Sequence, residues 1–111
     1  MTGYLVIHEI AYRGDELSQD RLDKLMNALL DVENGDDGIT DPDLAAALST
    51  GEVDVQMTVE ATDPAEAATK ALCAVRTAIH AIGDATPGWE TSHGVMRIAP
   101  IEVSDRLFAG A

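Results

Sequence analysis

The stretch Glu52-Val-Asp-Val-Gln-Met-Thr-Val-Glu-Ala61 has the most regular pattern in the chain. Apolar and polar residues alternate along it, and this period of two predicts a strand with one apolar face and one wet face. Before it, Thr50-Gly51 is typical of a tight hairpin turn. The segment Leu44 to Ser49 is rich in alanine and leucine, which favour helix, but it is short for a helix and adjoins that turn. We therefore predict that 44–49 is a strand, paired antiparallel with 52–61.

A helix should follow this strand directly. Asp63 can cap it, Pro64 suits its first position, and Glu66 stands where a capping box has its acid. Gly83 is a natural stop, so the predicted helix runs from Pro64 to Ile82. Its expected buried stripe consists of Ala68, Leu72, Val75, Ile79 and Ile82, with small Ala67, Ala71, Ala74 and Ala78 letting it lie close to a sheet.

The remaining elements are predicted from weaker patterns. Gly3 to Tyr12 is apolar at alternate and adjacent positions, which suits a central strand covered on both faces. Ser18 should cap a helix from Gln19 to Val32, and Val95 to Val103 should form the last strand. Ile39 either tucks under the polar loop or begins a short strand. The apolar stripe expected in the first helix consists of Leu22, Leu25, Met26, Leu29 and Leu30.

The predicted order is strand, helix, strand, strand, helix, strand. This order predicts an α+β fold of the ferredoxin-like split β-α-β type, with a four-stranded antiparallel sheet and two helices on one face. The first and third strands would be central. We expect one domain over residues 1–111, with 104–111 as a short C-terminal tail. The sequence does not decide which face of the first strand is buried.

Charge is the most unusual feature of the composition. Seven Lys and Arg stand against twenty Asp and Glu, a formal net charge of −13. Such a surface should repel nucleic acid and anionic membranes, so neither is expected as a partner. Solubility alone explains the charge, and an acidic surface for a basic protein, including mimicry of nucleic acid, is the alternative.

Other features of the sequence indicate the cellular compartment in which the protein is expected. Cys73 is the only cysteine, which excludes an internal disulfide, and we expect it to be buried as a small apolar residue. The first residues do not form a signal peptide, and no apolar run is long enough to cross a membrane, so we expect a cytoplasmic protein.

No motif for catalysis, phosphate binding or metal binding occurs in the sequence. His8, His80 and His93 lack the short spacing of metal ligands, and the acidic segment from Glu33 does not fit a calcium loop. We therefore expect no cofactor, no metal and no catalytic residue. Trp89, the only tryptophan, should cover one end of the core or line a ligand pocket.

Three segments of the second half resemble a pattern in small proteins of high-GC actinobacteria. They are Asp63-Pro64-Ala65-Glu66-Ala67, His80-Ala81-Ile82-Gly83 and Thr86-Pro87-Gly88-Trp89-Glu90. The resemblance implies a bacterial cytoplasmic origin. It implies no activity, because none is established for those proteins.

These observations favour a non-enzymatic interaction or regulatory module that forms a homodimer through its open sheet face or an edge strand. If Tyr4, Val6, His8 and Ile10 lie on the open face, that face needs cover. One alternative is a small enzyme or ligand binder of the dimeric α/β-barrel type. Its pocket would be lined by His8, Tyr12, Trp89 and His93. The other alternative is an acidic mimic that binds a basic protein.

Overall fold

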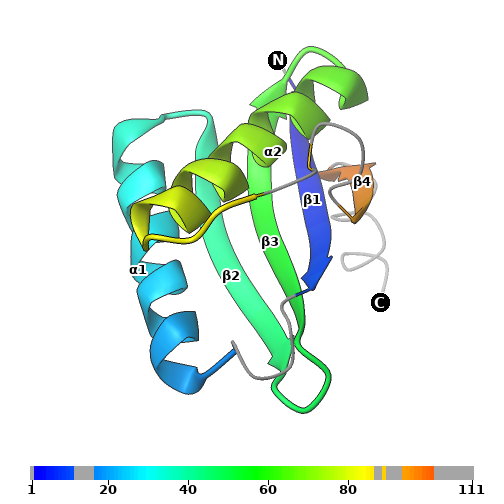
Figure 1. The fold of residues 1–111 in the computed structure, drawn as a ribbon. Helices are drawn as coiled ribbons and strands as arrows, with labels where there is room; N and C mark the ends of the chain where they lie inside the picture. The colour runs from blue at the N-terminus through cyan, green and yellow to red at the C-terminus, as the bar shows by residue number, and fades with distance from the viewer. Residues whose placement is uncertain (1, 12–16, 87–88, 90–93, 102–111) are drawn as a thin grey trace, which may run out of the picture.

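The computed structural model describes residues 2–11, 17–86, 89 and 94–101, and its elements follow the order strand, helix, strand, strand, helix, strand. The strands form one antiparallel sheet in the order β2-β3-β1-β4, and both helices lie on the same side of it (Figure 1). The α+β class predicted from the sequence is thus confirmed. The elements are β1 (Thr2–Ala11), α1 (Gln19–Gly35), β2 (Ile39–Ala47), β3 (Glu52–Ala61), α2 (Pro64–Ala81) and β4 (Val95–Pro100).

The two central strands, β1 and β3, are paired along their full length. The register runs from Thr2 opposite Ala61 to Ala11 opposite Glu52. The bounds of β3 are those predicted from its alternating sequence. Residues directly opposite one another share a face of a sheet. The buried face is therefore built from alternate residues of both strands: Tyr4, Val6, His8, Ile10, Val53, Val55, Met57 and Val59.

This register decides which face of β1 is covered. Tyr4, Val6, His8 and Ile10 lie under the helices and are at most 6% exposed. The expectation that these side chains lie on the open face is therefore wrong. Leu5 and Ile7, the residues between them, face the open side and are half-buried. The physical reason is that β3 has only one apolar face, and the apolar side chains of β1 join it.

Helix α1 begins where Ser18 caps it, since the Ser18 hydroxyl accepts a hydrogen bond from the Arg21 amide at 3.2 Å. It continues to Gly35, one turn beyond the predicted end. Leu25 and Leu29 are each 1% exposed, whereas Leu30, which the predicted stripe includes, is 38% exposed. Ala28 takes its place in the core, so the buried stripe of α1 is narrower than its leucines suggest.

Helix α2 is bounded by two caps that the sequence predicts. Asp63 accepts from the Glu66 amide at 2.8 Å, and Gly83, with φ of 89°, ends the helix in a Schellman motif. That motif is completed by bonds from the Gly83 amide to the His80 carbonyl and from the Asp84 amide to the Ile79 carbonyl. The residues of α2 that are buried against the sheet are Ala67, Ala71, Ala74, Val75, Ala78 and Ile79.

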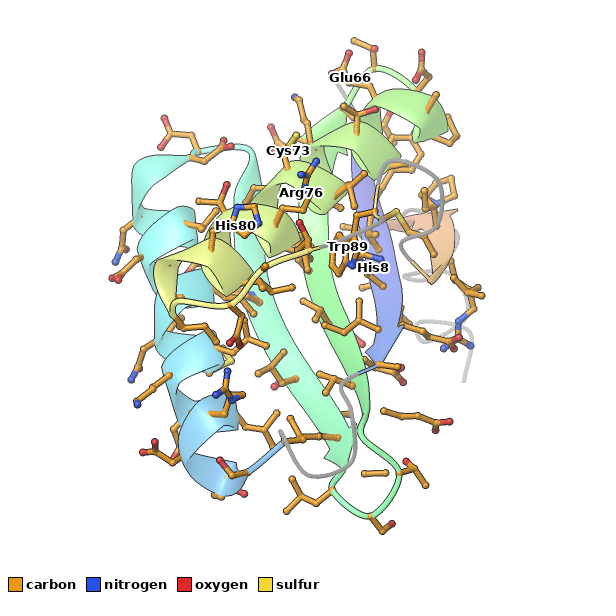
Figure 2. All side chains as sticks on the ribbon, in the orientation of Figure 1. His8, Glu66, Cys73, Arg76, His80 and Trp89 are labelled. Carbon is orange, nitrogen blue, oxygen red and sulfur yellow. The ribbon has the colours of Figure 1, made fainter. Side chains whose placement is uncertain are left out.

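Cys73 lies on the outward side of α2 and is exposed (Figure 2). The prediction that Cys73 is buried is wrong. The alanines Ala71 and Ala74, rather than Leu72, face the sheet and set the phase of the helix. Successive residues of a helix are about 100° apart around its axis. A helix that turns Ala71 and Ala74 toward the sheet therefore turns position 73 toward solvent.

Strand β2 is longer at its start than predicted and shorter at its end. It begins at Ile39, which is 1% exposed, so the alternative of a strand at Ile39 is correct. The register shifts between Thr40 and Asp43, and Asp41 has φ of 54°. The strand predicted over 44–49 is confirmed as far as Ala47, and the turn is wider than Thr50-Gly51 because it also takes in residues 48 and 49.

Strand β4 pairs with β1 from Val95 opposite Glu9 to Pro100 opposite Tyr4. It ends earlier than the predicted Val103, as expected for a strand that reaches a proline. Residues 102 and 103 and the predicted tail 104–111 lie outside the described part of the chain. Gly94 leads into β4 with φ of 92°, and a Cβ there would overlap the Glu9 carbonyl oxygen.

Glu66 makes the start of α2 sensitive to pH. Its carboxylate accepts a 2.9 Å hydrogen bond from the Thr62 hydroxyl and lies 3.2 Å from the Lys70 ammonium. The Thr62 bond, then Lys70, lowers the pKa of Glu66 from its ordinary value of 4.5. A carboxylate whose pKa is lower in the folded than in the unfolded chain stabilises the fold above the unfolded value, and this contribution is lost as pH falls through the folded value. Glu66→Gln should therefore lower the urea midpoint near neutral pH, and the difference from wild type should shrink below pH 4.5.

The control for this prediction is Thr62→Val, which removes the first cause of the shift but leaves the carboxylate. Substituting Glu66 in that background should change the pH dependence less than in wild type. A difference between Glu66→Gln and wild type that is the same at acidic and neutral pH would contradict the assignment.

Candidate functional site

His8 and Trp89 are the two predicted pocket residues that the structure brings together. Their ring centroids are 5.5 Å apart and the rings meet edge to face at 70° (Figure 2). His8 is fully buried in the middle of β1, with Val55 and Met96 as its neighbours across the sheet. Trp89 is half-buried and packs on the same core. The contact therefore covers the core, which is the structural role expected of a lone tryptophan.

The other two predicted pocket residues, Tyr12 and His93, lie outside the described part of the chain. Each belongs to a segment that borders this region in sequence: Tyr12 follows β1, and His93 precedes Gly94. The proposed four-residue pocket is thus represented by its His8–Trp89 half. A molecule that reached the His8 imidazole from the side of Trp89 would have to displace the indole, because His8 has no exposed surface.

Thr86 fastens the connection between α2 and β4 to the outward side of α2. Its hydroxyl lies 3.0 Å from His80 Nε2 and 3.3 Å from Arg76 Nε, which donates to it. Thr86 is only 6% exposed, and the Trp89 amide donates to its carbonyl at 3.3 Å. A hydroxyl between a histidine and an arginine resembles an activated nucleophile, but this one is buried and shared by two partners. We assign it to holding Trp89 over His8.

An ion pair connects the two helices at their neighbouring ends. Arg21, in the first turn of α1, contacts the carboxylate of Asp84, which follows the Schellman motif of α2. The two residues are 63 positions apart in sequence. No local pattern could have predicted this contact, although both caps that position it were predicted.

Neither α1 nor α2 covers the other face of the sheet (Figure 1), called here the open face, where a Cβ on Gly3 would lie 3.0 Å from Ile101 Cδ1. Its centre is apolar, with Leu5 and Ile7 on β1 beside Ala99 on β4, and Val95 at its end is 58% exposed. On the other side, Thr58 and Gln56 of β3 flank the same two residues of β1. This surface has an apolar centre and a polar border, which is the arrangement of a protein interface.

Acidic side chains gather at one end of this face. Glu9, Glu52 and Asp54 line a groove of about 380 Å³ together with Gly94 and Val95. Arg97 approaches Glu9 at 3.1 Å and offsets one of the carboxylates. Within residues 2–11, 17–86, 89 and 94–101, no group of three or more His, Cys, Asp or Glu is arranged to hold a metal ion.

The sequence could have indicated the open face, because Leu5 and Ile7 alternate with the buried residues of β1. It could not show which face of β1 the helices cover, since both faces of this strand are apolar. The partner of Arg21, Asp84, lies 63 positions away, and no local pattern in the sequence indicated it. Comparisons with protein-family models, curated proteins and solved structures gave no match for this chain. Among the described helices, neither has the length and hydropathy that crossing a lipid bilayer requires.

Proposed function

We propose that the chain is a non-enzymatic interaction module that pairs with a second copy of itself through the open face of its sheet. We further infer that the fold is the ferredoxin-like split β-α-β sandwich. The element order and the central positions of β1 and β3 support this. In such a sandwich one sheet face is left uncovered, and that face needs either water or a partner.

The observation that carries the proposal is the apolar centre of the open face. Leu5, Ile7 and Ala99 are neighbours across β1 and β4, and all three retain exposed surface although they lie in the middle of a sheet. Burial of apolar surface contributes about 25 cal/mol per Å². A second copy offers the same apolar centre, so the two surfaces match by symmetry.

Charges on this face support a two-fold arrangement. A two-fold axis that runs along β1, in the plane of the interface, would place β4 of one protomer over β3 of the other. Arg97 and Gln56 lie in the same row, both opposite Ile7. Arg97 of one protomer would therefore lie over Gln56 of the other, beside Asp54. This arrangement gives each arginine a carboxylate from the opposite protomer.

Net charge opposes pairing, since each protomer carries −13. Salt screens repulsion between exposed charges beyond roughly 10 Å, so dimer formation should strengthen as salt is raised. Binding to a basic protein has the opposite dependence. The salt dependence of the molar mass thus separates self-association from the acidic-mimic alternative.

Ile7→Lys is the variant that tests the interface. In wild type, light scattering after gel filtration should give twice the protomer mass of 11.7 kDa. Placing a charge at the centre of the apolar surface should weaken the dimer by at least about thirtyfold and give the protomer mass. The control is Thr77→Lys, which makes the same charge change on the outward side of α2 and should leave the dimer intact. A monomeric wild type at both low and high salt, or a dimeric Ile7→Lys, would refute the proposal.

The enzyme alternative is supported less well by the same geometry. His8 lies on the covered face, inside the core and under Trp89, rather than at a surface that a substrate can reach. The hydroxyl of Thr86, the polar group held between Arg76 and His80, is buried.

A further inference from the structure

The side chain of Ile101 lies on the open face of the sheet, against the first residues of β1. Strand β4 pairs with β1 as far as Pro100, opposite Tyr4, and Ile101 is the next residue. Tyr4 lies on the covered face, so a side chain on the neighbouring Gly3 would point to the open face. A Cβ built on Gly3 would lie 3.0 Å from Ile101 Cδ1 and 3.9 Å from Ile101 Cβ. The chain that follows β4 therefore begins its course over the open face.

Gly3 makes room for this contact. It lies in a central strand, opposite Glu60 of β3, where a glycine gives up the packing that a side chain would provide. A glycine inside a strand often marks a place where another part of the chain approaches closely. A larger residue at position 3 would meet Ile101. This end of the open face is thus shaped to receive the chain that comes after β4.

An apolar row continues along β1 from this contact. Leu5 and Ile7 follow Gly3 on the same face, and a strand that rises ~3.4 Å per residue places them ~7 Å and ~14 Å from it. Both side chains are half-buried and keep exposed surface. A segment that starts at Ile101 therefore has apolar surface directly beside it.

The segment after Ile101 has the length and the composition to cover this row. Residues 102–111 lie outside the described part of the chain, and their sequence is Glu-Val-Ser-Asp-Arg-Leu-Phe-Ala-Gly-Ala. Leu107 and Phe108 are its largest apolar residues. From Ile101 to Leu107 the chain spans about 9 Å if it is helical and up to about 20 Å if it is extended. The first conformation reaches Leu5, and the second also reaches Ile7.

Two properties favour this segment as an occupant of the open face when the protein is dilute. The segment is tethered to the face at Ile101, and a short tether gives an effective concentration of order millimolar. Its charge is also low, with two acidic residues and one basic residue, whereas a second copy of the chain brings −13. Repulsion from the acidic protein is therefore much weaker for the segment than for a second copy.

We propose that residues 102–111 pack Leu107 and Phe108 on Leu5 and Ile7 and so compete with the second copy for the open face. The contact within one chain is independent of the dimer, whereas the competition rests on the proposed function. Both protomers must release the segment before they can pair. A segment that is bound about two thirds of the time would therefore weaken the dimer roughly tenfold.

Leu107→Gln with Phe108→Gln tests the competition, because it removes the apolar side chains without changing charge. In the full chain at fixed salt, this variant should lower the dimer dissociation constant roughly tenfold, as measured by sedimentation. The matched control is Ser104→Gln with Ala109→Gln, which makes two neutral exchanges in the same segment and should leave the constant unchanged. An unchanged or raised dissociation constant in the first variant would overturn the competition.

Methyl-labelled protein tests the contact itself, at a concentration where sedimentation gives the protomer mass of 11.7 kDa. The Ile7 methyl groups should show nuclear Overhauser effects to the Phe108 ring. The methyl signals of Leu5 and Ile7 should shift in Leu107→Gln with Phe108→Gln but not in the control.

The two measurements separate this inference from the proposed function. Overhauser effects to Phe108 in a chain that never dimerises would support the segment on the open face and refute the dimer. A dimer whose protomers show neither the Overhauser effects nor the methyl shifts would refute this inference and leave the dimer standing.

Discussion

Gly94→Ala should destabilise the fold by roughly 3–5 kcal/mol, a large share of the total stability of a domain of this size. Two costs add. The φ of 92° at Gly94 is unfavourable for a residue with a Cβ, and that Cβ would overlap the Glu9 carbonyl oxygen. To remove this overlap, β1 and the start of β4 would have to move apart where Val95 pairs with Glu9. Urea denaturation followed by circular dichroism measures the loss.

Two other glycines separate these costs. Gly83 has φ of 89° but open space around its Cβ position, so Gly83→Ala should cost only about 1 kcal/mol for the backbone conformation. Gly35 has open space at the end of α1 and no positive φ, so Gly35→Ala should be neutral or stabilise by up to about 1 kcal/mol. If Gly94→Ala proved no worse than Gly83→Ala, the close approach of Gly94 to β1 would be wrong.

Leu25→Ala should be the most damaging truncation in α1, at about 2–5 kcal/mol. Leu25 is 1% exposed and belongs to the core formed with the covered sheet face, so its loss leaves a cavity as well as removing apolar contact. The fall in the urea midpoint measures this cost.

Leu30→Ala is the matched control, because it makes the same chemical change on the same helix. Leu30 is 38% exposed, so its truncation should cost less than about 1 kcal/mol. The predicted stripe treats the two leucines alike, whereas the structure separates them. Equal costs would favour the stripe and contradict the burial in the structure.

Local signals explain what could be predicted. The strict alternation of β3 and the caps Ser18 and Asp63 act within a few residues, and each lies where the sequence placed it. The covered face of β1 depends on its pairing with β3, which the sequence of β1 alone does not contain. The prediction that Cys73 is buried fails for a similar reason, since the phase of α2 follows from how closely its alanines approach the sheet.

The candidate site could be predicted only in part. His8 and Trp89 stand out in the sequence as chemically distinctive residues, and they do meet, but on the covered side of the sheet.

The pairing of β1 with β3 also constrains the order in which the chain can fold. Thr2 pairs with Ala61, and β2 has β3 as its partner in the described sheet, so neither β1 nor β2 can enter that sheet before Glu52 onward is available. Contacts so distant in sequence slow the search for the native topology. Until β3 joins, the apolar residues on both faces of β1 have no strand to pair with. The middle of the chain, rather than its beginning, therefore sets the moment at which the sheet can form, and the unpaired β1 is the segment most exposed to aggregation until then.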